Sequence, residues 1–276
     1  PTKHIIVNFP VGRIYLQTMK QTVRNIILLF CIGMFFPVMA VDLPVIPKPN
    51  QVEQLSGNFD LTQAVQIMTS GIPRQSAKRF RDYLCKAGFR SGKGHKAIIE
   101  LCKEKGKAYF VSNEAYRLHI EPGKIIITAG NEKGLFYGLQ TLLQLTVEYG
   151  ATKQIPALNI TDSPRFAYRG MHLDVSRHFF SVDFIKKQLD MMAYYKLNRF
   201  HWHLTDGPGW RLEIKKYPLL TDLAAWRTHK TWKDWWASPR HYVSKTDTGA
   251  FGGYYTQDEA REIVRYAAER HITVIP

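Results

Sequence analysis

The sequence predicts an α/β protein in which a small α+β domain precedes a unit of parallel strands. The segment 170–204 supports the parallel unit, because its apolar residues recur first with a period of two, then with a helical period, then again with a period of two. The segment 97–145 supports the α+β domain, because it combines helical patterns with a hairpin. The chain as a whole is 45% hydrophobic, which indicates a packed globular protein.

The parallel unit is predicted to consist of a strand at 170–175, a helix at 181–195 and a strand at 199–204. Two strands joined by a crossover helix lie parallel to each other. Ligands of such units bind beyond the carboxyl ends of the strands. The loops at those ends carry Arg177 and Asp206, which are therefore candidate site residues.

The α+β domain is predicted from five elements. Helices are expected at 76–87 and 132–145, where leucine and other apolar residues recur at helical spacing. A strand is expected at 97–102. Two alternating segments, 116–120 and 125–128, flank a Pro-Gly turn and predict a hairpin.

The amino-terminal residues divide into two segments that precede these domains. Residues 1–18 come before the first methionine, and we assign them no role. Residues 19–40 have a basic start, an apolar run and small residues before Ala40, which predicts a signal peptide cleaved after Ala40 and a secreted or periplasmic protein. The apolar run is short for a membrane span of ~20 residues. The α+β domain then occupies 41–162 and the parallel unit 163–276.

The carboxyl-terminal region begins with a long segment, 228–255, that is rich in tryptophan, glycine and charge. Segments of that length are typically functional or disordered. A capping box at Thr256 and Glu259 opens a helix. Its expected buried residues are Ala260, Ile263, Val264 and Ala267. A third strand begins at 272, and its open edge predicts that the 276 residues are part of a longer protein.

Charge and cysteine content limit the classes of partner. The net charge is +15, but the basic residues are scattered, so we expect no nucleic-acid partner. Cys31 lies in the predicted signal peptide, where Phe30 before it fits lipoprotein processing poorly. Cys85 and Cys102 are either a disulfide or two separate thiols, and the sequence favours neither.

His201 and His203 raise the question of a metal site, because histidines two apart on a strand share a face. Further ligands would have to come from later strands. Inward-facing histidines that are satisfied by hydrogen bonds are the more economical interpretation, and we expect no metal and no other cofactor.

Arg177 and Asp206 fit a sugar site better than a metal site. A guanidinium presents a rigid fork of donors that suits adjacent hydroxyls, and a carboxylate on the next loop can orient a catalytic group. From the residues alone, a surface arginine and a turn aspartate explain the pattern equally well.

Four sequence blocks resemble the β-N-acetylhexosaminidases of glycoside hydrolase family 20. They read AYRLHIEPGKIIITAGNEKGLFYGLQTLLQL, RGMHLDVSRHFF, YYKLNRFHWHLTDGPGWRLEI and GGYYTQDEAREIVRYAAERHITVIP, and the similarity runs from about Leu43 to Pro276. The resemblance implies an N-terminal α+β domain followed by the first strands of a (β/α)8 TIM barrel. Since the fourth strand is not reached, the barrel is expected to be incomplete.

The resemblance implies removal of terminal β-linked N-acetylglucosamine or N-acetylgalactosamine with retention, assisted by the substrate's own acetamido group. Arg177, in the SRH motif, is implied to bind the 3- and 4-hydroxyls of the terminal sugar. Asp206, in the HLTD motif, is implied to support the acid through a histidine that follows the third strand. Arg169 and Asp174 are expected to be structural.

The family's catalytic Asp-Glu pair lies on the fourth strand, so we expect the 276 residues alone to be inactive. The implied partners are oligosaccharides or glycoconjugates that end in an amino sugar, with no stable membrane span after signal cleavage. Two alternatives stay open. One is a relative that binds amino sugars without hydrolysing them, and the other is a metal-dependent barrel hydrolase.

Overall fold

The computed structural model describes residues 43–92, 94–104 and 112–276. The chain divides into two compact units, 1–40 and 41–276, and only residues of the second are described. The segment 1–18, the signal peptide predicted at 19–40 and its cleavage after Ala40 lie outside the described residues. Within the described part of the chain, no helix combines the length and apolar character needed to cross a membrane.

Two sheets organise the described residues. The elements of the first are β1 (Gln51–Asp60), β2 (Ala64–Ser70), α2 (Arg74–Lys86), β3 (Arg90–Ser91), β4 (Ala97–Lys103), β5 (Tyr116–Glu121), β6 (Lys124–Ala129), α3 (Glu132–Glu148) and β7 (Gln154–Asp162). Those of the second are β8 (Gly170–Asp174), α4 (Val182–Tyr194), β9 (Arg199–His203), α7 (Gln257–Ala268) and β14 (Thr273–Ile275). Between β9 and α7 lie the short elements β10 (Thr205–Asp206), β11 (Gly209–Trp210), α5 (Leu219–Asp222), β12 (Trp226–Arg227), α6 (Trp232–Ala237) and β13 (Phe251–Gly252).

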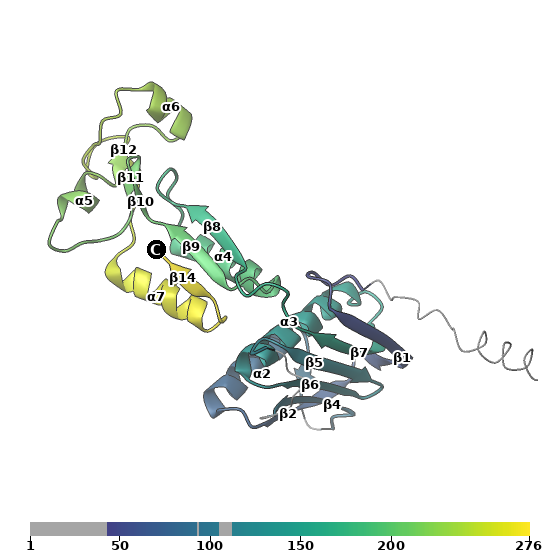
Figure 1. Ribbon diagram of the computed structural model, residues 1–276. Coiled ribbons are helices and arrows are strands. Elements are labelled where there is room, and N and C mark those ends of the chain that lie inside the picture. Colours follow the sequence, from purple (N-terminus) through teal and green to yellow (C-terminus); the bar gives the residue numbers. More distant parts are fainter. Residues whose placement is uncertain (1–42, 93, 105–111) are drawn as a thin grey trace, which may run out of the picture. The chain divides into compact units, whose positions relative to one another are not determined.

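The first sheet has seven strands in the order β1-β7-β5-β6-β4-β2-β3. β5 and β6 form the predicted antiparallel hairpin, whereas β2, β4 and β6 run parallel. α3 packs against β4, β5 and β6 with α2 beside it (Figure 1). The side chain of Asn131 caps α3 by accepting hydrogen bonds from two backbone amides. A mixed sheet with helices packed on it is the α+β domain that the sequence predicts.

The second sheet contains the strands β14, β9 and β8 in that order, all parallel. Asp174 at the end of β8 is in register with His203 at the end of β9. Ser181 caps the crossover helix α4, and α7 starts with the predicted capping box of Thr256 and Glu259. The parallel βαβ unit is therefore confirmed, and its two loops emerge at the same edge of the sheet.

Some details differ from the sequence prediction. Val264 was expected in the core but is 48% exposed, because α7 buries a narrower stripe that includes Ile263 and Ala267. β1, β2 and β7 were not predicted. The segment 228–255 is not a plain loop, since it contains α6 and β13.

The two described cysteines are separate thiols. Cys85 is exposed and Cys102 is partly buried. Burial, followed by a hydrogen bond to Glu100 and the charge of that carboxylate, raises the pKa of the Cys102 thiol to about 12. Cys102 is therefore a protonated, unreactive group near neutral pH.

Candidate active site

Arg177 and Asp206 meet at the carboxyl edge of the parallel sheet. Arg177 lies in the loop after β8, and Asp206 lies in the short strand β10 that follows β9. Arg177 Nη1 lies 2.6 Å from Asp206 Oδ2. Their side chains are 35% and 38% exposed, so the pair is open to a ligand. The register of parallel strands brings these loops together, as their positions in the sequence predicted.

Asp174, for which the sequence indicated a structural role, supports Arg177 from the end of β8. Its Oδ1 accepts hydrogen bonds from the backbone amides of Ser176 at 2.9 Å and Arg177 at 3.1 Å. Its Oδ2 lies 3.0 Å from Arg177 Nη1. The same carboxylate therefore shapes the loop and holds the guanidinium. An aspartate followed by a polar loop is a typical side-chain turn, and that signal was available in the sequence.

The carboxylate of Asp206 is set up as an acceptor. The backbone amide of Gly207 donates to Oδ1 at 2.6 Å, and this bond is the main reason that the pKa of Asp206 lies below its usual value. Arg177 and His203 lower the pKa further. A general acid needs a raised pKa, so Asp206 is suited to orienting other groups and not to donating a proton at neutral pH.

The guanidinium of Arg177 also contacts a tryptophan of the long segment. The guanidinium carbon lies 5.6 Å from the ring centroid of Trp232 in α6. Nearby, the hydroxyl of Tyr242 donates to the carbonyl of Gly207, beside Asp206. These contacts attach the segment 228–255 to both loops of the site. Trp232 and Tyr242 were not singled out from the sequence, which indicated only that a segment of this length is either functional or disordered.

Three histidines line the polar face of the parallel strands. The ring centroids of His172 and His201 are 4.6 Å apart, and those of His172 and His203 are 5.5 Å apart. Within the described residues, no group of three or more His, Cys, Asp or Glu side chains is arranged to hold a metal ion. His203 contributes to the site directly, because its Nε2 lies 3.4 Å from both Arg177 Nη1 and Asp206 Oδ2.

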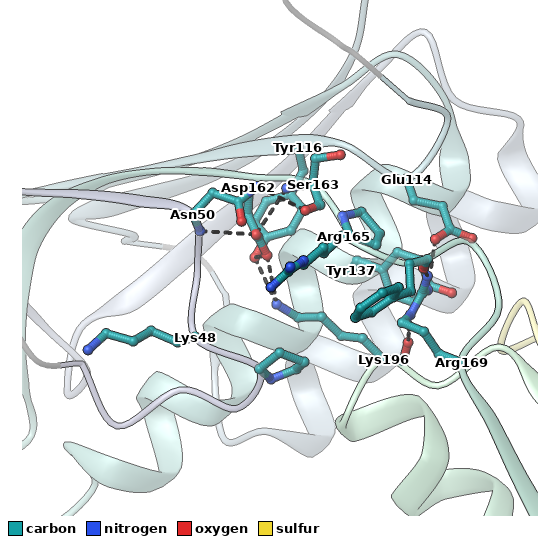
Figure 2. Close-up of a pocket in the computed structure, with 13 residues that line it drawn as sticks. Lys48, Asn50, Glu114, Tyr116, Tyr137, Asp162, Ser163, Arg165, Arg169 and Lys196 are labelled. Carbon is teal, nitrogen blue, oxygen red and sulfur yellow. Dashed lines mark hydrogen bonds and ion pairs between the residues drawn. The ribbon is translucent and has the colours of Figure 1, made fainter.

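A cavity of about 290 Å³ lies apart from this site, where the α+β domain meets the parallel unit. Figure 2 shows the polar side chains that line it, with Lys196 directed at Asp162. The lining groups bind one another: Lys196 Nζ donates to Tyr116 at 2.9 Å, and Asp162 accepts from the amide of Asn50 at 3.2 Å. Arg169 Nη2 lies 2.7 Å from Oε2 of Glu114 in the α+β domain. The cavity is therefore part of a domain junction, where Arg169 has the structural role expected of it.

Comparison with known proteins links this geometry to a family. Residues 166–276 match the model of the glycosyl hydrolase family 20 catalytic domain, and residues 42–163 match that of domain 2 of the same family. A β-hexosaminidase of Vibrio furnissii is 37% identical over 237 residues, which is 86% of this chain and 37% of that protein. A β-hexosaminidase of Porphyromonas gingivalis is 36% identical and covers 84% of this chain and 29% of that protein.

Solved structures agree with the sequence relatives. The family 20 exo-β-N-acetylglucosaminidase of Vibrio harveyi in complex with N-acetylglucosamine matches 84% of this chain and 35% of that chain, with a TM-score of 0.66 and 36% identity. The β-N-acetylhexosaminidase of Bacteroides fragilis matches with a TM-score of 0.65 and 32% identity, over 84% of this chain and 44% of that one. The chain thus spans less than half the length of these relatives. Since the two family models together account for nearly all described residues, the chain belongs to glycosyl hydrolase family 20.

Proposed function

We propose that this protein is an exo-acting β-N-acetylhexosaminidase that hydrolyses terminal β-linked N-acetylglucosamine or N-acetylgalactosamine with retention. Its substrates are oligosaccharides or glycoconjugates that end in an amino sugar. In this family the acetamido oxygen of the substrate attacks the anomeric carbon to form an oxazolinium, while a glutamic acid protonates the leaving oxygen and the preceding aspartate orients the acetamido group. Relatives named β-hexosaminidase support this proposal.

The single observation that carries the proposal is the environment of Arg177. Its guanidinium is partly exposed at the edge of the parallel sheet and is fixed by Asp174 and Asp206. Both carboxylates contact the same nitrogen, Nη1. Among the described residues the other donors of the guanidinium fork have no hydrogen-bond partner, so they can serve two adjacent hydroxyls of a terminal sugar. Donors held in place before binding lose little entropy when the sugar binds.

We further propose that the 276 residues alone bind the sugar without hydrolysing it. The pKa of Asp206 lies below its usual value, mainly through the Gly207 amide, so this carboxylate is ionised at neutral pH. Asp174 accepts two backbone hydrogen bonds and pairs with Arg177. Neither carboxylate is placed as a proton donor, which supports a substrate-binding half of the site and leaves the acid to other residues.

Binding and turnover test these proposals separately. Calorimetric titration of the 276-residue chain with methyl β-N-acetylglucosaminide is expected to detect binding. Arg177→Ala should weaken the affinity by roughly tenfold or more, because it removes one or several charge-assisted hydrogen bonds. Arg261→Ala is the matched control, because Arg261 is 60% exposed and pairs with Asp258 in α7. Unchanged affinity in Arg177→Ala would refute the assignment of Arg177 as a sugar-binding residue.

Turnover is measured with the protein expressed from its own gene at its natural length. We expect release of p-nitrophenol from the β-N-acetylglucosaminide and none from the β-glucoside, which lacks the acetamido nucleophile. Equal rates on both substrates would exclude substrate assistance. Sugar binding without turnover by that protein would instead favour the second candidate, a non-catalytic relative that binds amino sugars. The contacts of Asp174 and Asp206 with Arg177 are compatible with this candidate too.

Export remains part of the proposal. The basic, apolar and small-residue pattern of residues 19–40 supports a secreted or periplasmic protein that is cleaved after Ala40. Amino-terminal sequencing of the mature protein is expected to begin at Val41. A mature protein that retains residues 19–40 would contradict cleavage.

A further inference from the structure

Two buried arginines lie beneath the loop that carries Arg177. Arg211 and Arg227 are both 0% exposed. Arg211 Nε donates to the carbonyl of Val175 at 3.0 Å, and its Nη2 donates to that of Ser176 at 2.8 Å. Arg227 Nη2 donates to the carbonyl of Arg177 itself at 2.7 Å. Three successive carbonyls of one loop are thus each held by a buried guanidinium.

The opposite ends of these guanidiniums bind the long segment and its flanks. Arg211 Nη1 donates to the carbonyls of Ala225 at 2.5 Å and Gly253 at 3.0 Å. Arg227 Nε donates to the carbonyl of His229 at 2.8 Å. The two arginines therefore tie the Arg177 loop to the segments around β12 and β13.

Stability alone is a poor explanation for this arrangement. Among the hydrogen bonds and ion pairs of the described residues, neither Arg211 nor Arg227 is bonded to a carboxylate, and Arg227 Nη1 is buried without a hydrogen-bond partner. Burial, followed by the charge of Arg227, lowers the pKa of Arg211 to about 10. Burying unneutralised charge is unfavourable, and apolar side chains of similar volume commonly stabilise a protein more.

The arrangement instead fixes backbone that the strands cannot fix. The ladder between β8 and β9 ends where the amide of Val175 donates to the carbonyl of His203 at 3.2 Å. Beyond this point, the carbonyls of residues 175–177 receive their hydrogen bonds from the planar forks of Arg211 and Arg227. Such a fork defines direction as well as distance, which a lysine ammonium does not.

We propose that Arg211 and Arg227 are positioning residues, which hold the backbone of Arg177 so that its guanidinium meets the hydroxyls of the terminal sugar. This inference rests on the proposed function, in which Arg177 binds the 3- and 4-hydroxyls. Neither buried arginine touches the sugar. Their effect on binding is therefore transmitted through Arg177, and it is largest for ligands that use those hydroxyls.

The test compares methyl β-N-acetylglucosaminide with its 4-deoxy analogue, titrated into the 276-residue chain. The wild-type chain is expected to prefer the parent sugar by roughly tenfold, the scale of one charge-assisted hydrogen bond. Arg227→Met and Arg177→Ala should each reduce this preference to about twofold or less. Arg261→Met, an exposed arginine of α7, should leave it unchanged.

The ratio of the affinities for the parent and the 4-deoxy sugar separates positioning of Arg177 from a general loosening of the structure. If Arg227→Met weakens both sugars equally and retains the preference, the inference is overturned although the proposed function stands. If the wild-type chain shows no preference and Arg177→Ala does not change the affinity for either sugar, the proposed role of Arg177 in sugar binding is wrong. The inference then fails with it. Loss of the preference in both variants, with a normal thermal melt, supports the inference.

Two further measurements remain decisive where Arg227→Met does not fold. Arg227→Lys keeps the positive charge but lacks the fork, so an intermediate preference is expected, and a full preference overturns the proposal. Hydrogen exchange on the wild-type chain needs no variant. The amides of Ser176 and Arg177 donate to Asp174 and should exchange as slowly as those of β8 only while the loop keeps its conformation, so fast exchange would show that the buried arginines do not hold the loop.

Discussion

Lys196 Nζ donates a hydrogen bond to the hydroxyl of Tyr116 at 2.9 Å and lies 3.2 Å from Asp162 Oδ2. Lys196 follows α4 of the parallel unit, whereas Tyr116 and Asp162 belong to β5 and β7 of the α+β domain. All three residues are buried. The junction between the domains therefore contains a buried ion pair, whose charged groups have little access to water as an alternative partner.

Removal of the ammonium should destabilise the protein strongly. Lys196→Met leaves the carboxylate of Asp162 buried and unpaired, which we expect to lower the free energy of unfolding by about 3–5 kcal/mol. Urea denaturation measures this change. Lys187→Met on exposed α4 surface is the control, and adding Asp162→Asn to Lys196→Met should recover part of the loss. A change below about 1 kcal/mol would show that the pair is not stabilising.

Acid should destabilise the junction through His271. Burial, followed by the charges of Lys133 and Arg79, lowers the pKa of His271 from 6.5 to about 4. The unfolded chain therefore binds a proton that the folded protein does not, and stability falls as the pH drops from 6.5 towards 4. The total loss is up to roughly 3 kcal/mol.

The control for His271 uses its backbone conformation. His271 has a φ of 57°, a region that asparagine tolerates, so His271→Asn removes the titration without forcing the backbone. Thermal melts at pH 4.5 and 7 should differ less in His271→Asn than in the wild-type chain. An identical pH dependence would mean that other groups cause the acid sensitivity.

Two glycines in one turn should respond differently to an added methyl group. A Cβ at Gly209 would lie 2.3 Å from the guanidinium carbon of Arg211, whereas a Cβ at Gly207 meets no atom within 4 Å. Arg211 is fully buried and cannot move aside. Gly209→Ala should therefore lower the free energy of unfolding by about 1–3 kcal/mol, measured in urea, with Gly207→Ala near wild type. Equal effects would argue against the packing of Arg211.

Trp232 should contribute modestly to sugar affinity. The guanidinium carbon of Arg177 lies over its ring, 5.6 Å from the ring centroid. Trp232→Ala removes a cation–π contact of about 0.5–1 kcal/mol, so roughly a two- to fivefold weaker affinity for methyl β-N-acetylglucosaminide is expected by calorimetry. Tyr217→Ala, a variant of a 56% exposed aromatic residue, is the control. An unaltered affinity in Trp232→Ala would exclude this role.

Periodicity and capping predicted much of the fold. The βαβ unit and the hairpin were readable because their apolar residues repeat regularly and because Thr256 and Glu259 mark a helix start. β1 was not readable, since it lies at the edge of its sheet and is largely exposed. Val264 was wrongly predicted to be buried, because the spacing of apolar residues shows which face of a helix is buried but not how wide that face is.

The site was predictable only in part. The contact between Arg177 and Asp206 was predictable because parallel strands bring their following loops together. Arg211 and Arg227 were not identified, because charged residues near the end of a strand ordinarily face solvent. Their burial depends on carbonyls from several loops far apart in the chain, and no local pattern encodes such a convergence.

The domain junction has a consequence for the order in which the chain folds during synthesis. Asn198, directly before β9, donates to Glu114 at 3.2 Å, and Gln144 of α3 donates to the carbonyl of Tyr194 at 2.8 Å. A ribosome completes the seven-stranded sheet and α3 before it makes α4, and domains fold from the amino terminus as they emerge. The finished α+β domain thus offers a docking surface, on which α4 can settle before β9 and β14 are made.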